Sequence, residues 1–470
     1  MITSTHMVAL PTSRRSFLKA VAAGTSLLSA QPNRPNILFI QTDDQRFDDL
    51  GCYGNTVIKT PHIDQLAKDG ILFRNHFVTT SICCCSRASI LTGQYMRRHG
   101  VTDFLTPLTA AQFAETYPAI LRREGYRTAF LGKYAIGNPT GERKALALPE
   151  TEFDYWLGFP QSINFKQTVD GTVRHLTPLI ADKTIEFLAA TPASKPFCIS
   201  LNFKEPHGPW NYMDPDRPNR YEDAAVKPPN TYTRQAFEEL PAFLRKSLNG
   251  TENGQWPGNP EKKFLDDVRT CYHLVTGVDA AVGRIMEALR QSGRDQNTVV
   301  IFTSDNGSLR GAHGLWGKWI PYEESIRVPL IIRDPRLPTS QRGSSREQIT
   351  LNIDIAPTLL QIAGLPPTAR MQGRNLAPII ANPKVAWRGE FFYEHSYTPD
   401  PPRLPIPPSE AVRTSQWKYI RYTTQKPIYE QLFDLKADPE ERQNLVANPD
   451  HNKTLDRFRT RWAALRAAAT

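Results

Sequence analysis

Short apolar runs alternate along this chain with segments in which apolar residues recur at a helical period. In residues 264–291, for example, apolar side chains recur every three or four residues and would share one side of a helix. Strand-like runs separated by helical segments are typical of a mainly parallel sheet flanked by helices on both faces. The pattern therefore predicts an α/β fold over most of the chain. The strand-like runs are residues 36–41, 127–131, 196–202, 298–303 and 328–332.

The pattern changes near residue 386, where short alternating runs replace the longer helical segments. They predict a small antiparallel sheet, closed by a helix over residues 452–468. We therefore expect a main domain over residues 34–380 and a small C-terminal α+β subdomain over residues 386–470. The short runs are residues 390–393, 410–414, 418–422 and 431–434.

Two polar segments interrupt these elements. Residues 211–260 are rich in Pro, Asn and charged side chains, which predicts a surface excursion near a functional site rather than core. Residues 399–408 are dense in proline and predict a loop between two strands of the small sheet.

The first thirty residues have the pattern of an export signal. Arg14 and Arg15 precede Phe17 and Leu18, and a run of small and apolar residues follows up to residue 30. This arrangement predicts a twin-arginine signal peptide over residues 1–30, handled by the twin-arginine translocase, and a periplasmic or extracellular location. A short amphipathic anchor or a disordered tail is the alternative.

Composition narrows the class of partner. The chain has 470 residues and a net charge of +10, three positive charges of which lie in the first thirty residues. A modest positive charge suits an anionic substrate, whereas the stacking aromatics or zinc fingers of a nucleic-acid binder are missing from the sequence. Six cysteines, three of them consecutive, do not make a disulfide framework.

Polar residues follow four of the predicted strands directly. In parallel α/β sheets, ligands bind at the carboxyl ends of the strands, so we expect these side chains to line one crevice. The residues are Asp43 and Asp44, Lys133, His207, and Asp305 with Asn306.

The two acidic pairs predict a metal site. Asp43 with Asp44, and Asp305 with Asn306, offer four oxygen donors without a thiolate or imidazole. Such a set favours a hard cation, namely Ca²⁺, or Mg²⁺ in a tighter site. Either pair alone could instead cap a helix or a turn.

Residues 81–93, Ser-Ile-Cys-Cys-Cys-Ser-Arg-Ala-Ser-Ile-Leu-Thr-Gly, resemble the sulfatase signature Cys-x-Pro-Ser-Arg-x-x-x-Leu-Thr-Gly. The resemblance implies that Cys83 is a metal ligand and the nucleophile, after oxidation to formylglycine by a formylglycine-generating or anaerobic sulfatase-maturating enzyme. Cys85 departs from the pattern, because the family has Pro or Ala there. A buried cysteine cluster, or a metal or redox motif, is the alternative interpretation.

Other catalytic roles also come from the resemblance. Arg87 lies one turn along a helix predicted over residues 86–92, and it would fix the formylglycine hydroxyl. Lys133 matches the lysine of the Gly-Lys-Trp-His element, in which Ala135 replaces the histidine usually assigned as the base; members similar to glucosamine-6-sulfatase also depart there. His207 would donate a proton to the leaving alcohol, and Lys318 would contact the sulfate and the leaving oxygen.

Three further residues are predicted to bind substrate. His313 lies in the segment that leads to Lys318, and His395 and Arg413 lie in the small subdomain, which in sulfatases helps to shape sugar recognition.

The resemblance covers nearly the whole chain after the signal. It implies an alkaline-phosphatase-like fold, a catalytic sulfatase domain over residues 34–380, and hydrolysis of sulfate esters on a sulfated saccharide. Two other functions stay open on the sequence alone. One is a phosphonate or phosphate ester hydrolase of the same fold, and the other is a catalytically inactive protein that binds sulfated glycans.

Overall fold

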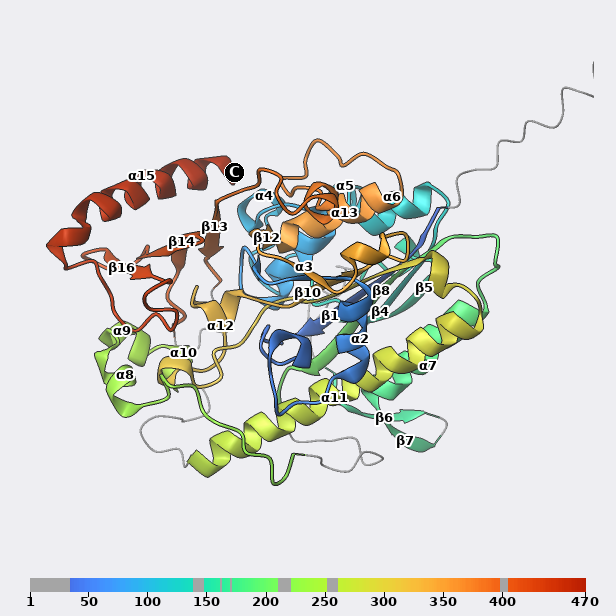
Figure 1. The fold of residues 1–470 in the computed structure, drawn as a ribbon, viewed down its shortest axis with the longest axis horizontal. Coiled ribbons are helices and arrows are strands. Elements are labelled where there is room, and N and C mark those ends of the chain that lie inside the picture. Colours follow the sequence, from blue (N-terminus) through green and yellow to red (C-terminus); the bar gives the residue numbers. More distant parts are fainter. Residues whose placement is uncertain are drawn as a thin grey trace, which may run out of the picture. The chain divides into compact units, whose positions relative to one another are not determined.

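An eight-stranded sheet forms the centre of the fold in this computed structural model (Figure 1), with the strand order β11-β2-β10-β9-β1-β8-β4-β5. The neighbours from β9 to β5 run parallel, whereas β10 (Leu330–Arg333) runs antiparallel to β9 and β2. The prediction of a mainly parallel sheet is therefore confirmed. The parallel strands are β1 (Asn36–Asp43), β4 (Arg127–Lys133), β5 (Tyr155–Phe159), β8 (Phe197–Pro206) and β9 (Thr298–Ser304).

The structure describes residues 34–137, 148–160, 163–169, 171–209, 221–251, 261–397 and 405–470. Residues Pro35–Thr470 form one compact unit. The predicted signal peptide, residues 1–30, lies outside the described residues, as does most of the predicted proline loop, residues 399–408. In the described part, no helix is both long and apolar enough to cross a bilayer.

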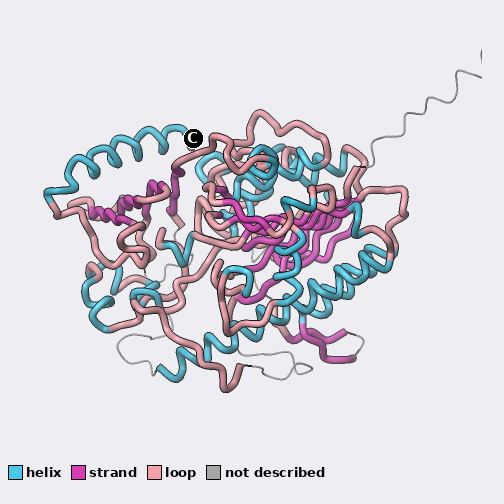
Figure 2. The backbone as a smooth tube through the Cα atoms, viewed as in Figure 1, coloured by secondary structure: helices cyan, strands magenta, loops and turns pink. Residues whose placement is uncertain are grey.

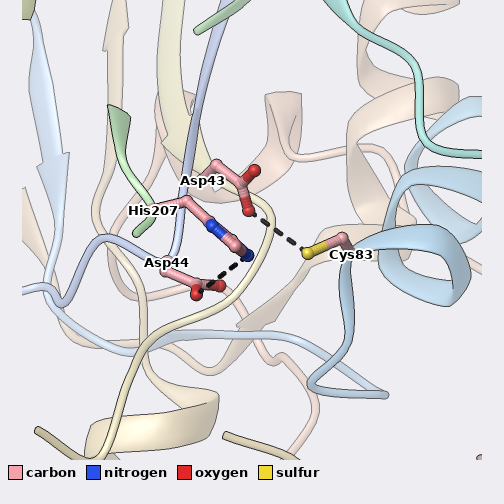
Figure 3. Close-up of side chains that lie close together, drawn as sticks. All are labelled: Asp43, Asp44, Cys83 and His207. Carbon is pink, nitrogen blue, oxygen red and sulfur yellow. Dashed lines mark hydrogen bonds and ion pairs between the residues drawn. The ribbon is translucent and has the colours of Figure 1, made fainter. Parts of the chain in front are cut away.

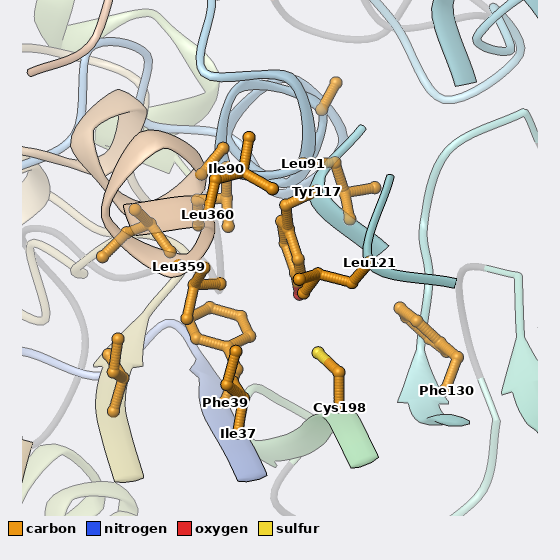
Figure 4. Packing of buried hydrophobic residues seen from close by; sticks show 14 of the residues in the cluster. Ile37, Phe39, Ile90, Leu91, Tyr117, Leu121, Phe130, Cys198, Leu359 and Leu360 are labelled. Atoms are coloured by element: carbon orange, nitrogen blue, oxygen red, sulfur yellow. The ribbon is translucent and has the colours of Figure 1, made fainter. Parts of the chain in front are cut away.

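Alternate side chains of β1 pack into two separate layers of core. Ile37 and Phe39 face α3 (Cys83–Thr92), α6 (Tyr117–Arg123) and α13 (Ile355–Ile362), as Figure 4 shows. Such alternation is what a strand buried on both faces produces.

On the opposite face of the sheet, Leu38 and Ile40 pack against the second set of helices. These helices are α2 (Pro61–Asp69), α7 (Leu176–Ala189) and α11 (Glu261–Gln291). The helix predicted over residues 264–291 is thus confirmed as α11, three residues longer at its start. The central sheet is covered on both faces, as predicted.

The C-terminal region forms a four-stranded antiparallel sheet covered by one helix (Figure 2). This confirms the predicted α+β subdomain, and the closing helix has the predicted bounds. The elements are β13 (Glu390–His395), β14 (Ser409–Thr414), β15 (Trp417–Tyr422), β16 (Tyr429–Asp434) and α15 (Asn452–Ala468).

The small sheet shares a core with the main body. Phe391, Tyr393 and Ile420 from the small sheet pack in one buried cluster with Phe77 and Ile326. The rings of Phe77 and Phe391 stack at 5.0 Å between centroids. Residues of the C-terminal sheet therefore lie against the segments that precede α3 and form α12 (Glu323–Ile326).

One predicted surface segment contributes to the core. The described part of the segment 211–260 contains α8 (Arg234–Glu239), α9 (Ala242–Arg245) and α10 (Leu248–Thr251). Leu244 is fully buried and packs in the same cluster as Tyr393. The prediction that this segment avoids the core is therefore wrong for residues 221–251, because their few apolar side chains point inward despite the polar composition.

The remaining elements are short. They are β2 (Ile71–Phe73), β3 (His76–Phe77), β6 (Lys166–Val169), β7 (Thr172–His175), β11 (Ser344–Arg346), β12 (Thr350–Leu351), α4 (Met96–His99), α5 (Ala110–Ala114) and α14 (Ala377–Ala381). Of these, β2 and β11 complete the central sheet, and β3 with β12 and β6 with β7 form two small sheets.

Candidate active site

Two carboxylates, those of Asp43 and Asp44, lie side by side in the sequence at the end of β1. Asp43 is the last residue of the strand and is fully buried. Asp44 follows with a φ of +63°, a left-handed conformation that aspartate tolerates better than most side chains. Its backbone N–H donates to Asp305 Oδ1 at 3.2 Å. The turn directly after the strand therefore holds the two acidic pairs together.

Cys83 is the first residue of α3, so the helix begins three residues earlier than the predicted range 86–92. Ile82, the N-cap, is extended and supplies no capping side chain, and Gly93 ends the helix at a φ of +67°. The first N–H groups of a helix lack partners within it and carry a partial positive charge. Cys83 therefore lies where an anion would be stabilised.

Three charged groups surround the Cys83 sulfur. The thiol donates to Asp43 Oδ1 at 3.2 Å (Figure 3), and the sulfur lies 2.9 Å from Lys318 Nζ and 3.4 Å from Lys133 Nζ. Lys133 also pairs with Asp43, and Lys318 pairs with Asp44. Both lysines are almost fully buried. The sulfur thus lies between the Asp43 carboxylate and two ammonium groups, each of which is paired with an aspartate.

Arg87 joins both acidic strand ends from one turn along α3. Its Nε donates to Asp305 Oδ2 at 2.8 Å, and its Nη2 lies 3.8 Å from Asp43 Oδ2. Its Nη1 donates to the Lys133 carbonyl at 2.5 Å. The predicted spacing of Cys83 and Arg87 thus brings the guanidinium to the same cluster, where it neutralises buried carboxylates.

Asn306 offers an oxygen that the described residues leave without a hydrogen bond. Its Nδ2 donates to Asp44 Oδ1 at 2.5 Å and to the Gly307 carbonyl at 2.8 Å. Its Oδ1 is buried and has no hydrogen-bond partner among the described residues. An orphaned acceptor beside three carboxylates is what a hard cation needs.

His207 lies at the opening of the cluster, and its side chain is about a third exposed, at 35%. Its Nδ1 lies 2.6 Å from the Gly208 carbonyl oxygen, which can only accept, so Nδ1 carries a proton. Its Nε2 lies 3.7 Å from Asp44 Oδ2 (Figure 3). The nitrogen that can gain or lose a proton therefore faces the cluster.

Burial and the negative charge of Asp43 raise the pKa values of two acidic groups in the cluster. Burial, and then the Asp43 charge, raise the pKa of the Cys83 thiol well above its ordinary value. Burial and Asp43 likewise raise the pKa of Asp305 to about 7, against the opposing charge of Arg87. A thiol that keeps its proton is a weak nucleophile, so the unmodified Cys83 is poorly suited to attack an ester.

The basic groups respond differently to the same surroundings. Burial alone would lower the pKa of Lys318, but Asp44 and its neighbours raise that pKa well above the ordinary value. Burial and the nearby Lys133 charge lower the pKa of His207. Lys318 therefore stays cationic at neutral pH, as a group that binds an anion must.

The predicted metal ligands and catalytic residues converge. Ligand atoms of Asp43, Asp44, Cys83 and His207 all lie within 4.8 Å of one another. Asp305 and Asn306 join the cluster through the contacts with Arg87 and Asp44. At Ala135 the chain provides only a methyl group, which is buried and held at a φ of +61°.

Among the described residues, no hydrogen bond or ion pair joins the three predicted substrate-binding residues to Cys83. Arg413 pairs with Glu323 at 3.2 Å and covers the Phe77 ring at 4.4 Å. His313 is buried against Tyr322, with 4.7 Å between ring centroids. His395 is also buried. Their assignment to substrate binding stays a prediction.

His395 gives a prediction about stability. Neither ring nitrogen has a hydrogen-bond partner among the described residues, and burial lowers its pKa to about 3. The unfolded pKa is about 6.5, so the unfolded state binds the proton more readily, and stability is lost as pH falls from 6.5 towards 3. We expect His395→Gln to reduce the pH slope of the unfolding free energy by about 1.4 kcal/mol per pH unit.

Urea unfolding at pH 7, 6 and 5 measures that slope. His62→Gln, a change at an exposed position on α2, controls for the loss of a histidine as such. An unchanged slope in His395→Gln would mean that this imidazole does not stay neutral in the folded protein.

Asn202 belongs to the site and was not among the predicted residues. Its Oδ1 accepts from Arg87 Nη1 at 3.3 Å, and the residue lies on β8, buried beside β1. The signal was an amide at the carboxyl end of a predicted strand, the same signal that identified Asn306.

Comparisons with known proteins agree with this geometry. A family profile described as "Sulfatase" matches residues 35–365, and a second, described as "N-sulphoglucosamine sulphohydrolase, C-terminal", matches residues 311–468. An N-acetylglucosamine-6-O-sulfatase from Bacteroides thetaiotaomicron is 28% identical and aligns with 96% of this chain and 90% of its own length.

Solved structures are similar over almost the same extent. One, in complex with its substrate D-glucosamine-2-N,6-O-disulfate, has a TM-score of 0.78 and 26% identity, with 93% of this chain and 98% of that chain covered. The phosphonate monoester hydrolase of Agrobacterium radiobacter has a TM-score of 0.79 and 26% identity, with 93% and 96% covered.

Proposed function

This chain belongs to the sulfatase family and is a sulfuric ester hydrolase, and we propose that its substrate is a sulfated carbohydrate, with a 6-sulfated amino sugar first among the candidates. The proposal is supported by the named relative that acts on N-acetylglucosamine 6-O-sulfate and by the similar structure that holds a disulfated glucosamine. The positive net charge of the chain also favours an anionic substrate.

One observation carries the proposed chemistry, namely the position of Cys83. Its sulfur lies at the N-terminus of a buried helix, within 3.2 Å of Asp43 Oδ1 and 2.9 Å of Lys318 Nζ. Because residues 81–93 resemble the sulfatase signature and the chain belongs to that family, we propose that residue 83 acts as formylglycine, made by a formylglycine-generating or anaerobic sulfatase-maturating enzyme. The hydrated aldehyde supplies one hydroxyl to attack sulfur and a second whose deprotonation expels sulfate.

The oxygen donors fit a divalent cation. Asp43, Asp44 and Asp305 supply carboxylates, and the Asn306 Oδ1 is an acceptor with no partner among the described residues. We propose Ca²⁺ for this site, with Mg²⁺ as the alternative. When bound, such a cation would offset the negative charge of the sulfate and acidify a nearby hydroxyl.

The basic side chains of the site then have distinct tasks. Lys318 and Lys133 would hold the sulfate oxygens, because both ammonium groups reach residue 83. Arg87 would keep Asp305 and Asp43 in place around the reacting atoms. His207, with its Nε2 towards the cluster and Nδ1 held by Gly208, would donate a proton to the departing alcohol.

Relative turnover of matched esters tests the substrate class. We expect kcat/KM for an aryl sulfate to exceed that for the corresponding aryl phosphate and phenyl phosphonate by about 10-fold or more, because the chain belongs to the sulfatase family and a site suited to sulfate transfer should stabilise that transition state more than the phosphorus ones. Steady-state kinetics with the three esters measures the ratio. A preference for the phosphorus esters would instead support the second candidate, a phosphonate or phosphate ester hydrolase, which the similarity to the Agrobacterium enzyme favours.

A panel of defined sulfated saccharides then tests the sugar. The 2-N-sulfated isomer serves as the comparison substrate. Release of sulfate from 6-sulfated glucosamine would support a 6-sulfated amino sugar as the substrate class. Binding of these saccharides without any turnover would favour an inactive glycan-binding protein.

We further propose export through the twin-arginine route. Arg14 and Arg15, followed by a small and apolar run, support this proposal. The route carries folded proteins, so a formylglycine made in the cytoplasm would reach the periplasm or the medium intact.

A further inference from the structure

A closed circuit of hydrogen bonds joins the segment before Cys83 to the segment that carries Lys318. The Tyr393 hydroxyl accepts from the Ser81 backbone N–H at 3.3 Å and donates to the Trp319 carbonyl. The Trp319 N–H in turn donates to the Ser81 carbonyl at 3.2 Å. Each group in the circuit therefore has its partner within it.

The three members come from distant parts of the chain. Ser81 precedes the proposed nucleophile by two residues, Trp319 follows Lys318 directly, and Tyr393 belongs to β13 of the C-terminal sheet. Tyr393 is fully buried in the core that the two sheets share. Its hydroxyl is both donor and acceptor, so its loss would leave two buried backbone groups without partners.

The backbone of Trp319, a member of this circuit, is strained. Trp319 has a φ of +76°, a conformation that a bulky side chain rarely adopts unless its surroundings impose it. Both polar groups of its backbone are held by the circuit, and the strained turn aims Lys318 at residue 83.

Ser81 has a second anchor on the opposite side. Its Oγ donates to the Ser325 carbonyl at 2.8 Å, in α12. The backbone on both sides of the 2.9 Å contact between Cys83 Sγ and Lys318 Nζ is thus fixed by hydrogen bonds that lie outside the site itself.

We propose that Tyr393 is a positioning residue for the reaction, and that its hydroxyl sets the separation between residue 83 and the Lys318 ammonium. The inference rests on the proposed function, because only that function makes the contact between residue 83 and Lys318 part of catalysis. Through Tyr393 the C-terminal sheet contributes to the rate as well as to the fold. A displacement of about 1 Å in a reacting group can cost about 100-fold in rate.

Tyr393→Phe tests the proposal, since it removes one oxygen and keeps the ring that packs in the core. We expect kcat for an aryl sulfate to fall about 10- to 100-fold, with KM close to the wild-type value, because the groups that bind the ground state remain. The formylglycine content of residue 83, measured by mass spectrometry, should equal that of the wild type, so that the loss is not one of maturation.

Tyr422→Phe is the matched control. Its hydroxyl donates to Gln431 Oε1 at 3.2 Å, in the same buried cluster but away from Ser81 and Trp319. Both variants should lower Tm, but only Tyr393→Phe should lower kcat. A wild-type kcat in Tyr393→Phe, or an equal loss in Tyr422→Phe, overturns the inference.

Ser81→Ala provides a second variant if Tyr393→Phe does not fold. It removes only the Oγ anchor to Ser325, which holds the same backbone from the other side, and we expect a smaller fall in kcat, again without a change in KM. An unchanged kcat would mean that fixing the backbone at Ser81 does not affect the rate, and would overturn the inference. If the wild-type enzyme itself fails to hydrolyse sulfate esters, the proposed function is overturned instead, so the two failures are distinguishable.

Discussion

Cys83→Ala is expected to lower turnover of sulfate esters by about 10⁴-fold or more, to the background rate, while the protein stays folded. The sulfur lies within hydrogen-bond distance of Asp43 and Lys318, so residue 83 is the group from which a nucleophile would be made. Loss of a covalent nucleophile removes the reaction path itself, which is why the expected effect is so large. Steady-state kinetics and a thermal melt together measure rate and folding.

Cys84→Ala is the matched control for that change. Cys84 is as deeply buried as Cys83, but its side chain belongs to the apolar core beside α3 rather than to the charged cluster. We expect this variant to lose some stability and to retain turnover. Substantial activity in Cys83→Ala would contradict the assigned nucleophile.

The mass of the protein from its native host decides two further points. The peptide that contains Cys83 should carry an aldehyde in place of the thiol, whereas an unmodified thiol would support the inactive glycan binder. The mass of the intact chain shows whether residues 1–30 have been removed. Their removal is expected if the segment is a cleaved twin-arginine signal.

Asp305→Asn is expected to weaken Ca²⁺ binding by about 100-fold or more and to lower kcat/KM at limiting Ca²⁺. Residues that merely orient a metal ligand contribute about 10- to 100-fold to affinity, and a charged ligand should contribute at least as much. The substitution also removes the negative charge that pairs with Arg87 Nε, whereas the contacts of Arg87 with Lys133 and Asp43 remain. Calorimetric titration of metal-stripped protein with Ca²⁺ measures the affinity.

Asp49→Asn controls for the loss of a buried carboxylate. Asp49 forms a double hydrogen bond with Arg310, at 2.9 and 2.6 Å, and no hydrogen bond or ion pair joins it to Cys83 among the described residues. It should destabilise the fold without changing Ca²⁺ affinity. If Asp305→Asn binds Ca²⁺ as tightly as the wild type, the cation site lies elsewhere. Partial rescue of its rate by excess Ca²⁺ would strengthen the assignment.

The sequence alone was sufficient for most of the elements and for the cluster apart from Asn202. Apolar periodicity is a local property, so the strands that end at Asp43 and directly before Asp305, the helix α11 and the small C-terminal sheet could all be predicted within a few residues. The rule that ligands bind at the carboxyl ends of parallel strands then placed the polar residues at one edge.

Only the tertiary structure decided which of these side chains meet and which do not. Asp44 and Asp305 are 261 residues apart, and nothing in a local pattern encodes the 3.2 Å between them. The same holds for Tyr393, whose hydroxyl joins Ser81 to Trp319 across 312 and 74 residues. Periodicity records whether a side chain is buried, whereas the partner it meets depends on how distant segments pack, and that is settled by the folded chain as a whole.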